Sequence, residues 1–347
     1  MTDGDLLGLH RVVEEAGRKP LPQQATRLDN DPAKLFETEI LVDVETLNVD
    51  AASFRQMEAA SGGDLDGVGR LVLETIAKRG KQHNPVTGSG GMLLGRVARV
   101  GARVVDRGFA VGDRIATLAS LSLTPLSVSR IRAIRAISAQ LDVEGTAVVF
   151  ASAPLGKLPT DLPERLALAV LDVAGAAPQV ARLTGPGETV IVLGGGGKSG
   201  LLCCQEARRR VGPEGKVFAF EAHAPFASEL RNLGICDEVL VGDAADAPSV
   251  RAEALRVTGG RGADLTLSCV NAGGCEMSAI LATRSRGRVY FFAMSTSFTA
   301  AALGAEGVGA DVDLYIGNGF AEGHAEHSLA LVRAYPELQA LLRSRYA

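Results

Sequence analysis

The pattern of hydrophobic and polar positions divides this sequence into a strand-rich first part and a second part in which strand and helix patterns alternate. Short alternating runs at Glu39–Leu47 and Gly95–Val105 predict β-strands, and Gly108–Thr117 predicts a turn followed by a strand. The stretch Ser53–Gly80 is polar and has a partly helical pattern. We therefore expect a β-rich domain that carries a helical insertion.

From about Pro163 onward, short apolar runs alternate with helical stretches. Strands that alternate with helices are typical of a parallel, doubly wound α/β sheet. After about Thr299 the alternation stops, and a last helix is expected from about Ala325 to Ser344. The strands of the sheet are expected near Val190, Val217, Val239, Leu265 and Val289.

Length, charge and cysteine content narrow the class of protein. A chain of 347 residues exceeds one ordinary hydrophobic core, so two domains are expected. The net charge of −4 provides no basic surface for nucleic acid or for an anionic membrane. No stretch has the apolar length of a membrane span, and Met1–Gly17 predicts a short amphipathic helix rather than a signal peptide. Five cysteines, an odd number, without a secretion signal favour reduced thiols in the cytoplasm.

The segment Val190–Arg208 (VIVLGGGGKSGLLCCQEAR) combines a strand, five glycines and an apolar helical pattern. Its glycines fit G-x-G-x-x-G, in which they allow a sharp turn, close approach of a pyrophosphate and tight packing of the helix on the strand. The helix N-terminus then offers free N–H groups and its positive dipole end to the phosphates. The expected contacts of a dinucleotide are Gly195, Gly197, Lys198, Ser199 and Gly200.

A second strand, Lys216–Phe220, ends at Glu221, about 20 residues beyond the glycine motif. A carboxylate there binds the hydroxyls of the adenosine ribose, whereas it repels the 2′-phosphate of NADP. The motif and Glu221 together favour a dinucleotide site over a merely structural turn. They also favour NAD over NADP, although His223 close by leaves NADP open. The ends of two later strands are expected beside the nicotinamide, at Val270, Asn271 and Met294.

The order of these parts resembles the medium-chain dehydrogenase/reductase superfamily. The turn Gly108–Ile115 (GFAVGDRI) is similar to the superfamily's G-F-x-V-G-D-R-V turn, and the glycines from Gly88 to Gly101 lie where it has G-H-E-x-x-G. The resemblance implies a β-rich GroES-like catalytic domain (1–158 and 302–347) and a Rossmann dinucleotide-binding domain (159–301). It also implies that NAD binds between the domains and that the protein is a homodimer.

Zinc-dependent members of that superfamily bind a catalytic zinc ion, and this sequence lacks suitable ligands for it. By alignment, the positions of their ligands fall on Asp50, on Ser89 and near Leu168. One aspartate and one serine lack the nitrogen and sulfur ligands that zinc prefers. We therefore expect no metal and a zinc-independent reaction.

Four further segments are long and distinctive: Asn48–Gln56 (NVDAASFRQ), Ala77–Leu94 (AKRGKQHNPVTGSGGMLL), Phe291–Gly309 (FFAMSTSFTAAALGAEGVG) and Tyr315–His327 (YIGNGFAEGHAEH). In these segments the sequence resembles a zinc-independent family, the L-erythro-3,5-diaminohexanoate dehydrogenases of lysine fermentation. The resemblance implies oxidative deamination of a small diamino acid. A hydride would leave carbon 3 of the substrate for NAD, and water would then release ammonia to give 5-amino-3-oxohexanoate.

The implied reaction needs a general base, because the amine must lose its proton before the hydride can leave. Asp172 interrupts an apolar stretch, where a charge is costly unless paired, so it is either catalytic or an ion-paired residue at a helix end. Asp50 and Ser89 either face the substrate or stabilise turns. Glu322, beside His324, either reaches the active site or lies at a subunit contact. The candidate catalytic residues are thus Asp172, Asp50, Ser89 and Glu322.

Three points stay open. The basic run of Lys78, Arg79 and Lys81 is either a solvated surface or a contact for the substrate carboxylate. A zinc-free quinone or enone reductase of the same superfamily is an alternative function, but it would normally use NADPH and needs no acids for an amine. A non-catalytic protein that binds NAD is the other alternative.

Overall fold

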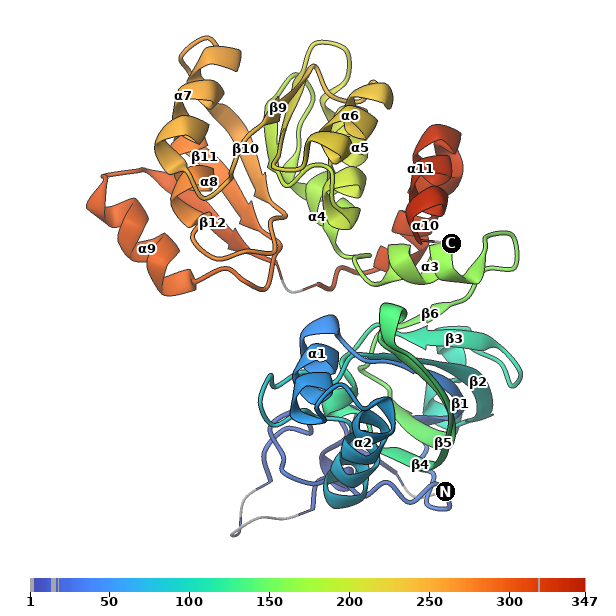
Figure 1. Cartoon of the computed structure of the whole chain (residues 1–347). Coiled ribbons are helices and arrows are strands. Elements are labelled where there is room, and N and C mark those ends of the chain that lie inside the picture. The colour runs from blue at the N-terminus through green and yellow to red at the C-terminus, as the bar shows by residue number, and fades with distance from the viewer. Residues whose placement is uncertain (1–2, 14–16, 18, 318, 347) are drawn as a thin grey trace. The chain divides into compact units, whose positions relative to one another are not determined.

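The computed structural model describes residues 3–13, 17, 19–317 and 319–346 of the chain. They form two compact units, Met1–Leu158 (unit 1) and Pro159–Ala347 (unit 2), as Figure 1 shows. Each unit contains one six-stranded sheet.

The sheet of unit 1 is antiparallel, with the strand order β4-β5-β1-β2-β3-β6. Alternate residues of the first strand, Ile40, Val42 and Val44, belong to the core of the unit, as a two-residue period requires. The β-rich first part is therefore confirmed. Its strands are β1 (Glu39–Asn48), β2 (Met92–Val100), β3 (Arg114–Thr117), β4 (Leu126–Arg135), β5 (Gln140–Phe150) and β6 (Leu155–Lys157).

Strand β2 ends at Val100, earlier than the predicted Val105. The chain passes very close to a neighbouring segment at Gly101, where an added Cβ would lie 2.4 Å from the carbonyl oxygen of Glu37. A 3-10 helix, Ala102–Arg107, follows in place of the rest of the strand.

The helical insertion consists of α1 (Ala51–Ala60) and α2 (Leu65–Arg79). Asp64 caps the start of α2 with its carboxylate, and Gly80 ends the helix with a φ of 65°. Val68, Val72 and Ile76 recur every four residues along α2 and are buried in the core of unit 1. The partly helical insertion predicted from the sequence is confirmed.

The amphipathic helix predicted over Met1–Gly17 is wrong for the residues described there, because they contain a 3-10 turn, Leu9–Arg11, and extended chain. Arg11 is fully buried, and its guanidinium binds the carboxylate of Glu39 at 2.7 Å, while Nε2 of His10 lies 2.7 Å from the same carboxylate. Burial by itself raises the pKa of Glu39, but the hydrogen bonds from Arg11 and His10 outweigh it and hold that pKa below its ordinary value. This ion pair fixes the N-terminal segment to β1.

The sheet of unit 2 is parallel throughout, with the order β12-β11-β10-β7-β8-β9. The direction of winding reverses between β7 and β10, which is where ligands bind in open α/β sheets. The predicted doubly wound sheet is confirmed. Its strands are β7 (Thr189–Leu193), β8 (Lys216–Glu221), β9 (Glu238–Val241), β10 (Ala263–Ser268), β11 (Thr283–Phe291) and β12 (Val312–Ile316).

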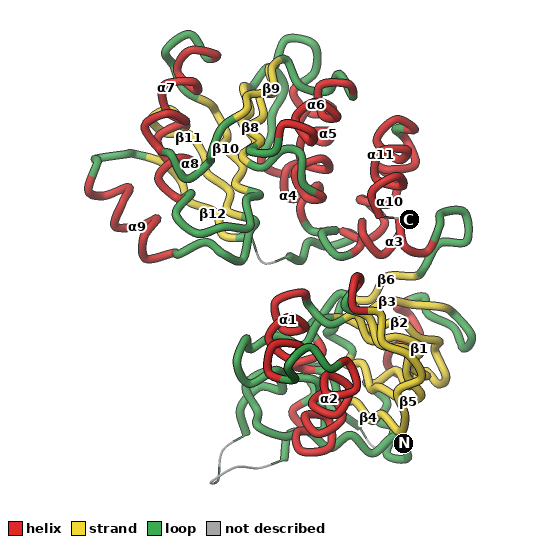
Figure 2. The backbone as a smooth tube through the Cα atoms, viewed as in Figure 1, coloured by secondary structure: helices red, strands yellow, loops and turns green. Residues whose placement is uncertain are grey.

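Helices lie on both faces of this sheet, as Figure 2 shows. Among the described residues, no single helix is long and apolar enough to cross a bilayer, and the bent pair of α3 and α4 meets that test only when both are taken together. The helices are α3 (Glu164–Leu171), α4 (Ala176–Leu183), α5 (Lys198–Val211), α6 (Ala224–Asn232), α7 (Ala247–Val257), α8 (Glu276–Ala282), α9 (Phe298–Gly307), α10 (His324–Ala334) and α11 (Pro336–Tyr346).

Residues 302–347 lie in unit 2, whereas the sequence suggested that they return to the β-rich domain. The reason is that β12 adds to the parallel sheet beside β11, and α10 and α11 pack on α3. The single helix expected over 325–344 is two helices. Proline cannot continue the backbone hydrogen bonding of a helix, and Pro336 begins α11 after a break at Tyr335.

Candidate functional site

The glycine-rich loop of unit 2 connects β7 to α5. The chain leaves β7 at Gly194 with a φ of 76°, a conformation that favours glycine. A Cβ at Gly195 would lie 2.7 Å from Cβ of Ala219, and a Cβ at Gly200 would lie 2.0 Å from the carbonyl oxygen of Gly194. The first and third glycines of the motif therefore allow the sharp turn and the close packing of helix on strand.

The second glycine of the motif, Gly197, occupies the N-cap position of α5. A Cβ there would meet its nearest neighbour at 3.6 Å, so the loop leaves space on this side. No side chain of the described residues caps the helix at Gly197, so its first N–H groups are available to a ligand. Free N–H groups at a helix N-terminus suit an anion, and the loop fits the pyrophosphate of a dinucleotide.

Glu221 ends β8 and is hydrogen-bonded to the glycine loop (residues 194–197). One carboxylate oxygen accepts a hydrogen bond from the backbone N–H of Gly196 at 3.0 Å, and the other accepts one from the N–H of His223 at 2.9 Å. Glu221 is buried, and a Cβ at Gly196 would lie 2.7 Å from its carboxylate oxygen and 2.8 Å from Cβ of Phe226. A fourth glycine is therefore required at position 196, in addition to the three of the motif.

The strand ends predicted beside the nicotinamide lie on the same edge of the sheet as the glycine loop. A Cβ at Gly194 would meet the Val270 side chain at 3.1 Å, so Val270 borders the loop directly. Asn271 and Met294 are exposed, and Ser295 links their two segments by donating a hydrogen bond to the carbonyl oxygen of Val270 at 3.1 Å.

Asp172 lies at the C-terminal end of α3 rather than within a helix, which removes the cost of a charge among apolar residues. Its carboxylate accepts a hydrogen bond from Nζ of Lys198 at 2.6 Å, and about half of its side chain is exposed. The structure thus shows Asp172 in an ion pair at a helix end, and its catalytic role stays a prediction. The structure also brings Asp172 beside the first residue of α5, at the glycine loop.

Asp50 and Ser89 belong to unit 1, where both contribute to a polar loop. Asp50 accepts a hydrogen bond from the N–H of Ser53 in the first turn of α1, at 3.1 Å. The carbonyl oxygen of Ser89 accepts one from the N–H of Asn84 at 2.9 Å, and the hydroxyl groups of Ser53 and Thr87 are hydrogen-bonded. The bond between Ser53 and Thr87 connects the loop of residues 84–89 to α1.

Asn84 organises this loop and was missed by sequence reasoning. Its side-chain oxygen accepts hydrogen bonds from the N–H groups of Val86 and Thr87, and its amide donates to Gln56 of α1 at 2.9 Å. Asn84 is buried, so this amide has a fixed orientation. The dipeptide Asn84-Pro85 was the available signal, because it is typical of turns.

The remaining sequence candidates lie in both units, with Lys78 and Lys81 in unit 1 and Glu322 in unit 2. Lys81 is fully buried and donates from Nζ to the carbonyl oxygen of Pro22 at 2.7 Å, whereas Lys78 is exposed at the end of α2. Glu322 is exposed in the turn before α10. His324 is buried against Phe320, and this burial lowers the pKa of its imidazole.

Within the described parts of the chain, no three His, Cys, Asp or Glu side chains are grouped to hold a metal ion. The five cysteines all lie in described positions and are free.

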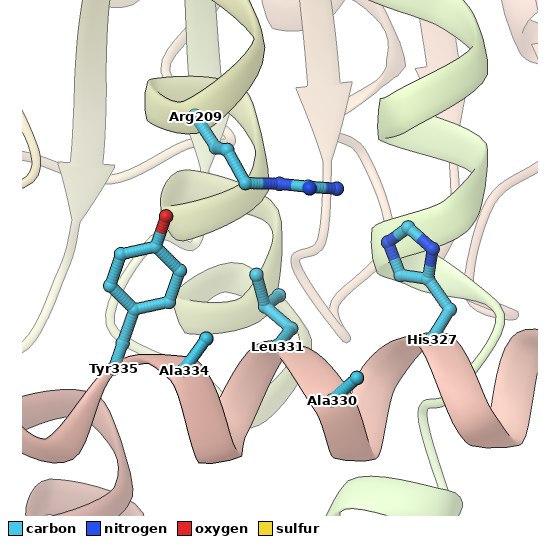
Figure 3. A pocket seen from close by; sticks show the side chains of 6 residues that line it. All are labelled: Arg209, His327, Ala330, Leu331, Ala334 and Tyr335. Atoms are coloured by element: carbon cyan, nitrogen blue, oxygen red, sulfur yellow. The ribbon is translucent and has the colours of Figure 1, made fainter.

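A cavity of about 250 Å³ lies between α5 and α10 (Figure 3). Figure 3 shows Arg209 of α5 extending over residues of α10, among them His327. The Glu206 carboxylate, fully buried, binds Arg209 at 2.6 Å and lies 3.4 Å from Nε2 of His327. Since the cavity opens near the C-terminal end of α5, it is separate from the glycine loop. Its lining consists of Arg209, His327, Ala330, Leu331, Ala334 and Tyr335.

Solved structures of other proteins share the fold of this chain and show its fold class. A quinone oxidoreductase from Pseudomonas syringae pv. Tomato DC3000 is 19% identical, with a TM-score of 0.52 over 89% of this chain and 81% of the other. An alcohol dehydrogenase superfamily protein from Novosphingobium aromaticivorans is 20% identical, with a TM-score of 0.52 over 95% and 86%. The chain has the fold of the medium-chain dehydrogenases and reductases.

Closer relatives identify the family within that class. Residues 10–159 match the model of the L-erythro-3,5-diaminohexanoate dehydrogenase N-terminal domain. The L-erythro-3,5-diaminohexanoate dehydrogenase of Acetoanaerobium sticklandii is 47% identical over 94% of both chains, and that of Fusobacterium nucleatum subsp. nucleatum is 43% identical over the full length of both. The chain belongs to the L-erythro-3,5-diaminohexanoate dehydrogenase family and is an oxidoreductase.

The fit of the loop to a dinucleotide predicts the effect of a methyl group at Gly200. We expect Gly200→Ala to weaken binding of NADH by about 10- to 100-fold, because overpacking of this size costs about 1–3 kcal/mol and displaces the helix N-terminus. Fluorescence titration with NADH measures the effect, with circular dichroism as the test of folding. Gly185→Ala is the control, since a Cβ there meets nothing closer than 3.4 Å. A folded Gly200→Ala protein with unchanged affinity would contradict the assignment of the loop.

Proposed function

We propose that this protein catalyses the NAD-dependent oxidative deamination of L-erythro-3,5-diaminohexanoate to 5-amino-3-oxohexanoate and ammonia. The observation that carries the proposal is the similarity of 43–47% over nearly the whole chain to two dehydrogenases named for that substrate. A nicotinamide dinucleotide is the class of cofactor that the family and the glycine loop define together.

The reaction balances with one water molecule per turnover. The neutral amine on carbon 3 supplies the electron pair that forms the C=N bond while the hydride leaves, and water then adds to the carbon. Loss of ammonia leaves the ketone. NAD, when bound, supplies the acceptor for the hydride. The protein must therefore hold the amine in its neutral form and orient carbon 3.

The residues of the loop and its border would hold the cofactor. Gly195, Gly197, Ser199 and Gly200 would face the pyrophosphate, and Lys198 would add a positive charge there. Val270, Asn271 and Met294 would border the nicotinamide half. We propose NAD rather than NADP because a 2′-phosphate would approach the buried carboxylate of Glu221.

The same proposal assigns the carboxylates to the amine groups. Asp172 is the proposed general base, since it stays half exposed while Lys198 holds it beside the glycine loop. Asp50 and Glu322 are proposed as acids for the ammonium groups of the substrate, and Ser89 as a residue of the substrate loop. A homodimer, a cytoplasmic location and a place in lysine fermentation stay predictions.

Turnover tests the proposed function directly. Purified protein with L-erythro-3,5-diaminohexanoate and NAD should produce NADH and ammonia in equal amounts, measured by absorbance and by an enzymatic ammonia assay. Activity should rise as the amine loses its proton with increasing pH. Confirmed NAD binding without turnover anywhere between about pH 7 and 10 would contradict the proposal and leave a non-catalytic NAD-binding protein. Reduction of a quinone or enone with NADPH, and no amine oxidation, would point to a reductase.

Asp172→Asn tests the assignment of the base. We expect kcat to fall by about 100-fold or more, because general bases contribute at least that much. Affinity for NAD should not fall, since the Lys198 cation is released from its partner and remains beside the loop. Steady-state kinetics and titration with NADH measure the two effects separately. Equal losses of kcat and of NADH affinity would mean that Asp172 has a structural role.

A further inference from the structure

Ordering the glycine loop (residues 194–197) costs conformational entropy, and the G-x-G-x-x-G motif itself supplies no side chains to offset that cost. Residues 194–197 are four consecutive glycines, and glycine loses more backbone freedom on ordering than any other residue. A dinucleotide that had to order this loop on binding would lose affinity. Strand β8 restrains the N–H side of the loop. The carbonyl oxygen of Phe220 accepts hydrogen bonds from the N–H groups of Gly194 and Gly195 at 2.8 and 3.0 Å, and Glu221 accepts one from Gly196.

The other side of Gly196 is bonded by the C-terminal helix. Arg345, in the last turn of α11, donates from Nη1 to the carbonyl oxygen of Gly196 at 2.5 Å. The same guanidinium pairs with Glu229 of α6 and lies 4.1 Å from the ring centroid of Phe226. The Arg345 side chain is only 10% exposed. Gly196 is thus hydrogen-bonded on both sides, through its N–H by Glu221 and through its carbonyl oxygen by Arg345.

A second contact joins the C-terminal end of α11 to Lys198, the first residue of α5 after the loop. Nζ of Lys198 lies 5.6 Å from the ring centroid of Tyr346, while it is hydrogen-bonded to Asp172. Helix α11 begins at Pro336, after the break at Tyr335 that ends α10, and its last turn contains Arg345 and Tyr346. Arg345 and Tyr346 are adjacent and contact the two halves of the loop, Gly196 and Lys198.

We propose that Arg345 is a positioning residue for the dinucleotide, acting through Gly196 from the C-terminal helix. It holds the loop in its binding conformation in the absence of ligand. Its charge is balanced by Glu229 and covered by Phe226, so it acts on the backbone rather than as a phosphate ligand. The inference rests on the proposed function, since it assumes that the loop binds a dinucleotide.

The test measures binding apart from chemistry. We expect Arg345→Ala to weaken binding of ADP-ribose about 10-fold by calorimetry, which is what loss of a charge-assisted hydrogen bond implies. KM for NAD should rise by a similar factor while kcat changes little, because Arg345 touches neither substrate nor nicotinamide. Exposed Arg343 lies on the same helix, and Arg343→Ala is the matched control that should leave both quantities unchanged.

Two further measurements separate positioning from general stability. In Arg345→Ala, hydrogen exchange of a peptide that contains residues 194–200 should become faster without ligand, while exchange in β10 stays unchanged. Arg345→Lys should restore part of the affinity, because an ammonium can still donate to the Gly196 carbonyl oxygen. If Arg345→Ala and Arg343→Ala bind ADP-ribose equally, or if only the thermal stability of Arg345→Ala falls, the inference is overturned. If the wild-type protein does not bind ADP-ribose, it is the proposed function that fails.

Discussion

The geometry of the candidate cofactor site depends on one residue, Gly196, which is hydrogen-bonded on both sides. Its N–H donates to the buried carboxylate of Glu221, and its carbonyl oxygen accepts from the guanidinium of Arg345. The loop around it has no side chains with which to hold itself, because residues 194–197 are all glycine. Bonds from outside the loop must therefore supply the order that the loop sequence lacks.

This constraint connects several parts of unit 2 that are distant in the sequence. Glu221 comes from the end of β8, Phe226 and Glu229 come from α6, and Arg345 comes from the last turn of the described chain. Each of them touches Gly196 or a group that touches it. These contacts also connect residues 302–347 to unit 2, because their last helix, α11, is hydrogen-bonded to the glycine loop. This constraint also makes position 196 intolerant of a side chain.

Much of the fold was predictable because it depends on local patterns. Alternating and apolar runs located β1 and the strands β7 to β11, and the spacing of glycines located the turn before α5. The end of β2 was not predictable, because it depends on the close approach of Gly101 to Glu37, which are far apart in the sequence. The break between α10 and α11 was predictable from Pro336 alone, and sequence reasoning gave that proline too little weight.

The candidate site was predictable in its motifs and not in its contacts. The positions of Gly195, Gly197, Gly200 and Glu221 follow from spacing, because all four lie in one strand-turn-helix-strand unit, β7–α5–β8. The pairing of Asp172 with Lys198 joins two segments through the fold, so the sequence predicted an ion pair only as one of two alternatives and did not name the partner. Arg345 carries no motif at all, and its role depends entirely on where α11 packs.

We propose that Glu221, which ends β8 beside the glycine loop, faces the adenosine ribose and so selects a dinucleotide without a 2′-phosphate. Calorimetric titration of the wild-type protein with ADP-ribose and with 2′-phospho-ADP-ribose tests it most directly, because neither ligand depends on substrate or turnover. The account predicts that ADP-ribose binds more tightly by about 10-fold or more, since the added phosphate faces a buried carboxylate. Equal affinity for the two ligands, or tighter binding of the 2′-phosphate form, would contradict it.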